Sequence, residues 1–239
     1  MTDSLVKLAS KITPDAIEAE RQRRKRNKLA SLFPNSGPLR RELYVKHLEF
    51  FRAGNQYRER AFIAGNRVGK TFTGCYEDVL HLTGRYPDWW EGRRFNCPVD
   101  GWVAGDTNLT CRDILQLTLL GKWDDFGTGL IPHDALLDWT RKAGIADAVD
   151  SVYVRHASGG ISVLGFKSYR EGRANFQGTS KHFVHFDEEP SVEVWREALM
   201  RTMIVPGDER GGLAYLTFTP LQGWSEVVDS FLGDAQTVQ

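Results

Sequence analysis

One stretch of this sequence has the residue types needed to hold a polyphosphate. It is the glycine-containing run Ala64-Gly65-Asn66-Arg67-Val68-Gly69-Lys70-Thr71. Glycines let successive backbone N–H groups curl around an anion, and a following helix directs its positive end at the same charge. Lys70 would reach the β- and γ-phosphates of a nucleotide, and the Thr71 hydroxyl would ligate Mg²⁺. The run therefore predicts a P-loop.

The match to the P-loop pattern G-x-x-x-x-G-K-[ST] is that of a variant. Ala64 stands where the first glycine belongs, and Gly65 comes one residue late. A Gly-Lys-Thr triplet also recurs by chance in strand-to-helix turns that carry a surface lysine. A second motif has to decide between these two interpretations.

An apolar segment that ends in acids supplies that second motif: His182-Phe183-Val184-His185-Phe186-Asp187-Glu188-Glu189-Pro190. Asp187 would hold Mg²⁺, and Glu188 would polarise the water that attacks the γ-phosphate, with Glu189 as the fallback base. The same acids also favour the first turn of a helix, and both roles are compatible. An apolar strand ending in Asp-Glu, 117 residues after Lys70 (187 − 70), makes a nucleotide hydrolase the favoured interpretation.

A third apolar segment, Leu213-Ala214-Tyr215-Leu216-Thr217-Phe218-Thr219-Pro220, ends in a hydroxyl and a proline. At a strand end beside the P-loop, Thr219 could sense the γ-phosphate and pass its loss to moving parts. Threonine is a common strand residue, so the order of the three motifs carries this interpretation.

These motifs require a sheet that places strand ends together. Ala61-Phe62-Ile63 precedes the P-loop and residues 72–82 are compatible with a helix, while ligands of parallel sheets bind outside the carboxyl ends of the strands. Further predicted elements are a strand at 101–105, a helix at 109–119 capped by residues 106–108, and a hairpin of 151–156 with 160–166. Residues 123–148 are predicted to be loop and short helix. The expected fold class is α/β, a P-loop NTPase of the RecA-like (ASCE) type with a mainly parallel central sheet flanked by helices, plus an antiparallel hairpin.

Two segments outside the motifs remain open to two interpretations. Residues 15–30 predict a helix whose basic run, Arg21 to Lys28, is either a solvated face or an arm that touches DNA phosphates or an acidic partner. Tyr44 and His47, in a predicted helical stretch at 39–53, either contact adenine or pack on the sheet. Pro34 to Pro38 predicts a linker.

The expected division is a helical basic arm and linker (1–38), the P-loop domain (39–220) and a tail or partial lid (221–239).

Composition excludes several other classes. The formal net charge of the 239 residues is zero and 41% are apolar, so any polyanion contact must come from a local patch. Three cysteines without C-x-x-C spacing disfavour a disulfide framework and a zinc site. Neither G-x-G-x-x-G nor H-E-x-x-H is present, which argues against a nicotinamide enzyme and a metalloprotease. The sequence has no apolar run long enough to span a bilayer and no signal-peptide pattern, and we expect a cytosolic protein.

With these motifs in this order, the sequence resembles the ATPase domain of the large terminase subunit of tailed bacteriophages, over roughly residues 39–220. The resemblance rests on the variant P-loop, on Val184 to Pro190, on Thr217-Phe218-Thr219-Pro220, similar to the coupling motif of the family, and on Tyr44 to Phe51, in the position of its adenine motif.

The resemblance implies further expectations. Arg67 would stabilise charge on the γ-phosphate, and Arg173 or Arg170 could act as an arginine finger on the neighbouring subunit of a ring. The family's partners would be double-stranded DNA, a portal protein and a small terminase subunit, with the protein in the host cytoplasm and transiently at the procapsid portal. A full-length relative would continue into a ribonuclease-H-like nuclease domain, which nothing after Pro220 is long enough to form, so no nuclease activity is expected.

The expected function is therefore hydrolysis of ATP with Mg²⁺, coupled to translocation of double-stranded DNA into a procapsid. One alternative is a helicase or recombination-type P-loop ATPase, which would be expected to show further helicase motifs. The other is a nucleotide-dependent interaction module, in which ATP orders a docking surface and the basic arm and Trp89-Trp90 make the contacts.

Overall fold

The computed structural model describes residues 13–221 and 223–233 and contains one seven-stranded sheet, in the order β1-β7-β6-β2-β5-β4-β3. Five strands, from β1 to β5 in that order, run parallel to their neighbours, and β4 and β3 continue the sheet in antiparallel pairing. The strands are β1 (Glu59–Ile63), β2 (Asp100–Gly105), β3 (Leu136–Arg141), β4 (Val149–Arg155), β5 (Ile161–Ser168), β6 (Phe183–Asp187) and β7 (Leu213–Phe218). The predicted fold class is confirmed.

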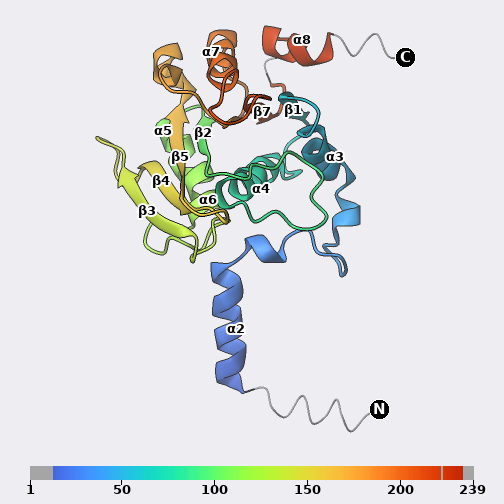
Figure 1. The fold of residues 1–239 in the computed structure, drawn as a ribbon, viewed down its shortest axis with the longest axis vertical. Helices are drawn as coiled ribbons and strands as arrows, with labels where there is room; N and C mark the ends of the chain where they lie inside the picture. The colour runs from blue at the N-terminus through green and yellow to red at the C-terminus, as the bar shows by residue number, and fades with distance from the viewer. Residues whose placement is uncertain (1–12, 222, 234–239) are drawn as a thin grey trace.

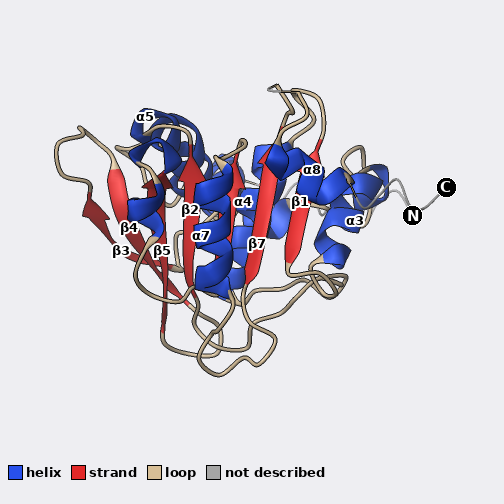
Figure 2. Ribbon diagram, turned by 90° about the horizontal axis from the view of Figure 1, so that it is seen from above, coloured by secondary structure: helices blue, strands red, loops and turns tan. Residues whose placement is uncertain are grey.

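Helices cover both faces of this sheet, as Figure 2 shows for α4 on one side and α7 with α8 on the other. The helices are α2 (Pro14–Arg26), α3 (Val45–Ala53), α4 (Lys70–Thr83), α5 (Asn108–Thr110), α6 (Leu117–Leu120), α7 (Val192–Thr202) and α8 (Glu226–Leu232). Short 3₁₀ segments are η1 (Leu29–Ser31), η2 (Arg41–Leu43), η4 (Tyr169–Glu171) and η5 (Arg173–Phe176), and a π-helical segment η3 (Cys111–Gln116) joins α5 to α6. None of the described helices is long and apolar enough to cross a membrane.

The central strands form for a simple reason. All residues of β6 and β7 are buried, and both read as nearly continuous apolar runs, which is typical of strands covered on both faces. β7 lies between β1 and β6, with Phe62 opposite Thr217 and Thr217 opposite Asp187. The carboxyl ends of the three motif strands therefore meet at one edge of the sheet.

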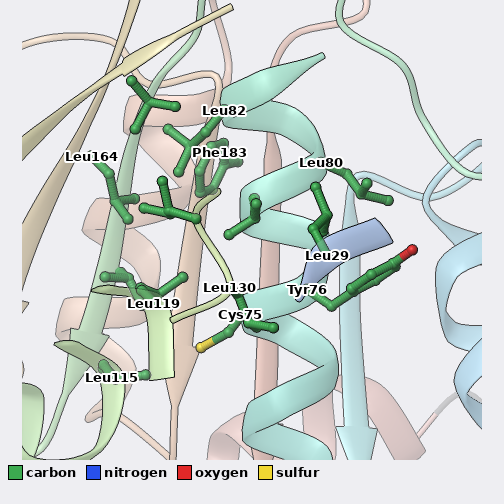
Figure 3. Packing of buried hydrophobic residues seen from close by; sticks show 14 of the residues in the cluster. Leu29, Cys75, Tyr76, Leu80, Leu82, Leu115, Leu119, Leu130, Leu164 and Phe183 are labelled. Carbon is green, nitrogen blue, oxygen red and sulfur yellow. The ribbon is translucent and has the colours of Figure 1, made fainter. Parts of the chain in front are cut away.

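The larger part of the core lies on the α4 side. Figure 3 shows Cys75, Tyr76, Leu80 and Leu82 of α4 packed with side chains of α6, β5 and β6. Aromatic residues of the loop at 86–98 close this cluster: Trp90 is buried and Trp89 is stacked parallel to Tyr76. Trp89-Trp90 is thus a hydrophobic anchor of the core and not the exposed contact pair that the interaction-module alternative needs.

The basic helix α2 extends away from the globular body (Figure 1) and buries none of its residues. Its charges are largely paired: Arg23 and Arg24 bond Glu20, and Lys25 and Arg26 reach Asp125. The body begins soon after it, because Leu29 and Phe33 already lie in the core. The first twelve residues of the predicted arm lie outside the described residues, as do 222 and 234–239 of the predicted tail.

One prediction about the elements was wrong. The sequence predicts loop and short helix for residues 123–148, but this segment contains β3. Its side chains are nearly all exposed, so the apolar alternation that marks a strand is weak, and pairing with β4 forms it instead. The predicted helix at 109–119 exists but changes to π-helical geometry in its middle, and Thr107 caps its start by accepting a bond from the Thr110 amide.

Candidate nucleotide-binding site

The P-loop connects β1 to α4, and its backbone departs from ordinary geometry at two residues. Gly69 lies in the left-handed region, with φ 83°, at the N-cap of α4. Arg67 adopts a similar conformation, with φ 64°, although it has a side chain. Ala64 is not among the positive-φ residues, which explains why alanine is tolerated where the common pattern has glycine.

Lys70 and Thr219 are brought together as the order of the motifs predicts. The Lys70 ammonium group is almost buried, and it donates hydrogen bonds to the Gly65 carbonyl oxygen at 2.7 Å and to Thr219 Oγ1 at 2.8 Å. Thr219 Oγ1 in turn donates to Asn66 Oδ1 at 2.9 Å. The end of β7 is thereby hydrogen-bonded to two residues of the P-loop, Lys70 and Asn66.

Thr71 and Asp187 form the second link between motifs. Thr71 Oγ1 donates to Asp187 Oδ1 at 2.7 Å, and Asp187 is 4% exposed. Burial raises the pKa of this carboxyl, while His185, the hydroxyls of Thr71 and Thr217, and Lys70 act in the opposite direction. Hydroxyl and carboxylate oxygens converging on a buried point are the ligand set that Mg²⁺ prefers, so these residues fit a magnesium ion.

Glu188 follows directly and is only partly buried. Its backbone has φ 73°, which turns the chain sharply at the end of β6, and its Oε2 accepts a weak bond of 3.4 Å from the Thr219 amide. Burial raises the pKa of Glu188, opposed by the Thr219 amide. The carboxylate is thus held beside Thr219 at the same edge as Lys70.

Glu189 points elsewhere. Its Oε1 accepts a hydrogen bond from the Ser225 hydroxyl at the N-cap of α8. This contact with the α8 segment favours Glu188 over Glu189, the fallback candidate, as the base.

Tyr44 and His47 lie next to the P-loop and pack against their neighbours, and their contact with adenine stays a prediction. His47 Nε2 donates to the Val68 carbonyl oxygen at 3.0 Å, and the His47 ring meets Phe62 edge-on. Burial lowers the pKa of His47. The two residues also line a cavity of about 200 Å³ with Phe33, Val68, Gly69 and Phe72, among others. An apolar cavity touching the P-loop has the chemistry of a base-binding pocket.

The three candidate arginines differ in their surroundings. Arg67 is exposed on the P-loop. Arg170 donates to Asp106 Oδ2 at 2.7 Å, and Arg173 donates to Glu197 Oε2 at 2.8 Å, while both side chains remain more than half exposed. They follow the carboxyl end of β5, which is separated from β1 by the three strands β7, β6 and β2.

Sequence reasoning missed two residues that lie directly behind the site. His185 Nε2 lies 2.8 Å from Thr217 Oγ1, and its Nδ1 lies 2.8 Å from Asp78 Oδ2. Burial acts to lower the pKa of His185, but the carboxylates of Asp78, Asp187 and Glu77 raise it overall. The available signal was the presence of two adjacent acids, Glu77 and Asp78, followed by the apolar residues Val79 and Leu80 in the helix after the P-loop.

Comparison with known proteins identifies the family of this chain. Residues 61–239 match the family described as terminase large subunit, T4likevirus-type, N-terminal. The chain belongs to this family. The resemblance drawn from the motifs is thus confirmed.

A relative within the family, the large terminase subunit of Salmonella phage P22, is 42% identical over 209 residues. The alignment covers 79% of this chain and 41% of the P22 protein, so the chain spans less than half of that relative. The ATPase domain of the Thermus phage P74-26 large terminase has a TM-score of 0.50 at 19% identity, covering 75% of this chain and 65% of that one. A point mutant of that domain has a TM-score of 0.51 at 18% identity, covering 80% and 74%. These solved structures share the fold with this chain.

Proposed function

We propose that this chain is the ATP-hydrolysing domain of a viral DNA-packaging motor, which couples hydrolysis to the translocation of double-stranded DNA into a procapsid. The observation that carries the proposal is the pair of hydrogen bonds that join three separate motifs, Lys70 to Thr219 and Thr71 to Asp187. Family membership and the ATPase domain with the shared fold support it.

In this proposal the P-loop residues Ala64 to Thr71 bind the phosphates through backbone N–H groups, and the cavity beside Tyr44 and His47 takes the base. Lys70 neutralises the γ-phosphate, with Arg67 as a second positive charge on the same loop. Thr71 and Asp187 hold Mg²⁺, which when bound withdraws charge from the phosphate oxygens. Most of the catalytic effect then comes from positioning and electrostatics.

Glu188 orients the attacking water and accepts its proton. Its place beside Thr219 supports this role, because the carboxylate is tied to the same strand end that contacts Lys70. A γ-phosphate would compete with Thr219 for the Lys70 ammonium group. Thr219, with Thr217 behind it in β7, would then transmit the presence or loss of the phosphate to the sheet and to the Pro220 segment.

The motor is proposed to work as a ring of copies at the procapsid portal in the host cytoplasm, with a portal protein and a small terminase subunit as partners. Arg173 or Arg170 would reach a neighbour's nucleotide. Both would first have to leave Glu197 or Asp106, which their exposure permits. α2 is a candidate contact for DNA phosphates, although most of its charges already have intramolecular partners.

The experiment is phosphate release from ATP and Mg²⁺ by the wild type and by Lys70→Ala, across protein concentration and with added linear double-stranded DNA. We expect activity that rises faster than linearly with protein, increases with DNA, and is lost in Lys70→Ala. A wild type that binds ATP but never releases phosphate would instead support an interaction module. Stimulation by single-stranded DNA alone would favour a helicase or recombination-type ATPase.

A further inference from the structure

A chain of buried hydrogen bonds runs from the candidate metal ligand Asp187 into the core. Asp187 Oδ1 accepts from Thr217 Oγ1 at 2.9 Å, and Thr217 Oγ1 lies 2.8 Å from His185 Nε2. His185 Nδ1 lies 2.8 Å from Asp78 Oδ2, and Asp78 Oδ1 accepts from the Tyr215 hydroxyl at 2.5 Å. Thr217, His185, Asp78 and Tyr215 are completely buried. Solvent therefore cannot replace any of these bonds.

The direction of the Thr217 hydroxyl determines whether Asp187 Oδ1 receives a hydrogen bond, because this hydroxyl has one proton and two bonding neighbours. If the proton points at Asp187, the Asp187 carboxylate is stabilised. If the proton points at His185 instead, lone pairs of Thr217 Oγ1 and of the buried Asp187 Oδ1 face each other across 2.9 Å, which is repulsive. With its proton on Asp187, the Thr217 hydroxyl can only accept from His185 Nε2, which makes the imidazole the group that orients this hydroxyl.

Asp78 fixes the other side of the ring. Its Oδ2 lies 2.8 Å from His185 Nδ1, so both ring nitrogens are engaged and the imidazole cannot turn without losing a buried hydrogen bond. Nε2 is thereby held facing the Thr217 hydroxyl.

The packing around His185 holds the ring in this position. Tyr215 is stacked on it with ring centroids 5.1 Å apart, and α4 approaches so closely that a Cβ on Gly74 would lie 2.3 Å from the imidazole. Cys75, Asp78 and His185 also offer atoms within 4.8 Å of one another, as a metal site would. Both oxygens of Asp78 and both nitrogens of His185 already have hydrogen-bond partners, which explains the cluster without an ion.

We propose that His185, held by Asp78, is a positioning residue for the nucleotide site: through the Thr217 hydroxyl it holds the Asp187 carboxylate in the orientation that would bind Mg²⁺. The proposal rests on the proposed function, because it assigns Asp187 to the metal. His185 touches neither nucleotide nor metal, and it acts through Thr217. Outer partners of metal ligands commonly change metal affinity by about 10- to 100-fold when they are removed.

Two pairs of variants test the hydrogen bond rather than the packing. In His185→Asn the side-chain amide nitrogen lies near the position of Nδ1 and the contact with Thr217 is lost, whereas His185→Gln can place a donor near Nε2. Thr217→Val removes the hydroxyl and Thr217→Ser keeps it. His81→Asn is the matched control, since His81 is also fully buried and bonded to a carboxylate of α4, Glu77.

The measurement is the Kd of Mn²⁺ in the presence of saturating ADP, from the electron paramagnetic resonance signal of free Mn²⁺, with ADP affinity in EDTA and the unfolding midpoint as further readouts. We expect His185→Asn and Thr217→Val to raise the Kd by about 10- to 100-fold. His185→Gln, Thr217→Ser and His81→Asn should remain near the wild type, and ADP affinity in EDTA should not change.

Equal Mn²⁺ affinities for His185→Asn and His185→Gln would overturn the proposal. If the His185 variants do not fold, equal affinities for Thr217→Val and Thr217→Ser would overturn it in the same way. A wild type that binds no Mn²⁺ with ADP would contradict the proposed function itself, so the two failures are distinguishable.

Discussion

Adjacent residues of α4 anchor two buried polar clusters that end in very different places. Glu77 accepts from both terminal nitrogens of Arg60 and bonds His81, and that cluster ends at the Phe50 carbonyl oxygen and the Tyr86 hydroxyl. Asp78 bonds His185 and Tyr215, and its cluster ends at Asp187. We call them the Glu77 cluster and the Asp78 cluster.

The difference follows from geometry. Consecutive residues of a helix point about 100° apart, so Glu77 faces β1 and α3 while Asp78 faces the strands β6 and β7. Buried charge alone therefore does not mark a functional residue. A functional role is indicated instead by where the hydrogen bonds of the cluster lead. Changes in the Glu77 cluster should therefore affect stability alone, and changes in the Asp78 cluster should also affect metal binding.

Breaking the Glu77 cluster should have the largest effect on stability. Arg60→Leu leaves the Glu77 carboxylate buried without its guanidinium, which costs about 3–5 kcal/mol of unfolding free energy for comparable pairs. Urea denaturation measures it, and the double variant Arg60→Leu/Glu77→Leu should recover most of the loss. A change in Arg60→Leu below about 1 kcal/mol would show that the pair is replaceable by water.

Crowding each cluster by one methyl group gives a matched pair. In Gly74→Ala the new Cβ would meet the His185 ring, and in Gly54→Ala it would meet the Arg60 guanidinium at 2.8 Å. Each should lose about 1–3 kcal/mol of unfolding free energy through overpacking. Only Gly74→Ala should also weaken Mn²⁺ binding with ADP. Equal Mn²⁺ affinities in the two variants would remove the distinction between the clusters.

The smallest expected effect is on the pH dependence of stability. Burial would raise the pKa of Glu77, but Arg60 and His81 outweigh it and lower the pKa below its ordinary value. A carboxyl with a lowered folded-state pKa contributes stability that is present above its unfolded pKa and is lost as pH falls through the folded one. Unfolding free energy should therefore fall less steeply below about pH 5 in Glu77→Gln than in the wild type. Parallel curves would contradict this ionisation.

The sequence predicts the parts of the site that are local in the chain. The P-loop turn, the acids after β6 and Thr219 after β7 each follow an apolar run, so their positions at strand ends can be predicted from pattern alone. The contact of Glu189 could not be predicted in this way. Its partner is Ser225, and the position of Ser225 depends on how α8 packs against the body.

The Asp78 cluster could not be predicted from the sequence either. Asp78 and His185 are 107 residues apart, and they meet only because β7 inserts between β1 and β6 and because Gly74 lets α4 approach the sheet. β3 was missed for the opposite reason: its exposed side chains carry no burial pattern, and only its pairing with β4 defines it.

The catalytic site is tested most directly by comparing two neighbouring carboxylates, Glu188 and Glu189, in single-turnover phosphate release from ATP. We expect Glu188→Gln still to bind ATP but to release phosphate at least about 100-fold more slowly, because the water loses its base. Glu189→Gln should remain near the wild-type rate, because its carboxylate bonds Ser225. Equal rates for the two variants, or a slow Glu189→Gln with an active Glu188→Gln, would contradict the assignment of the catalytic site.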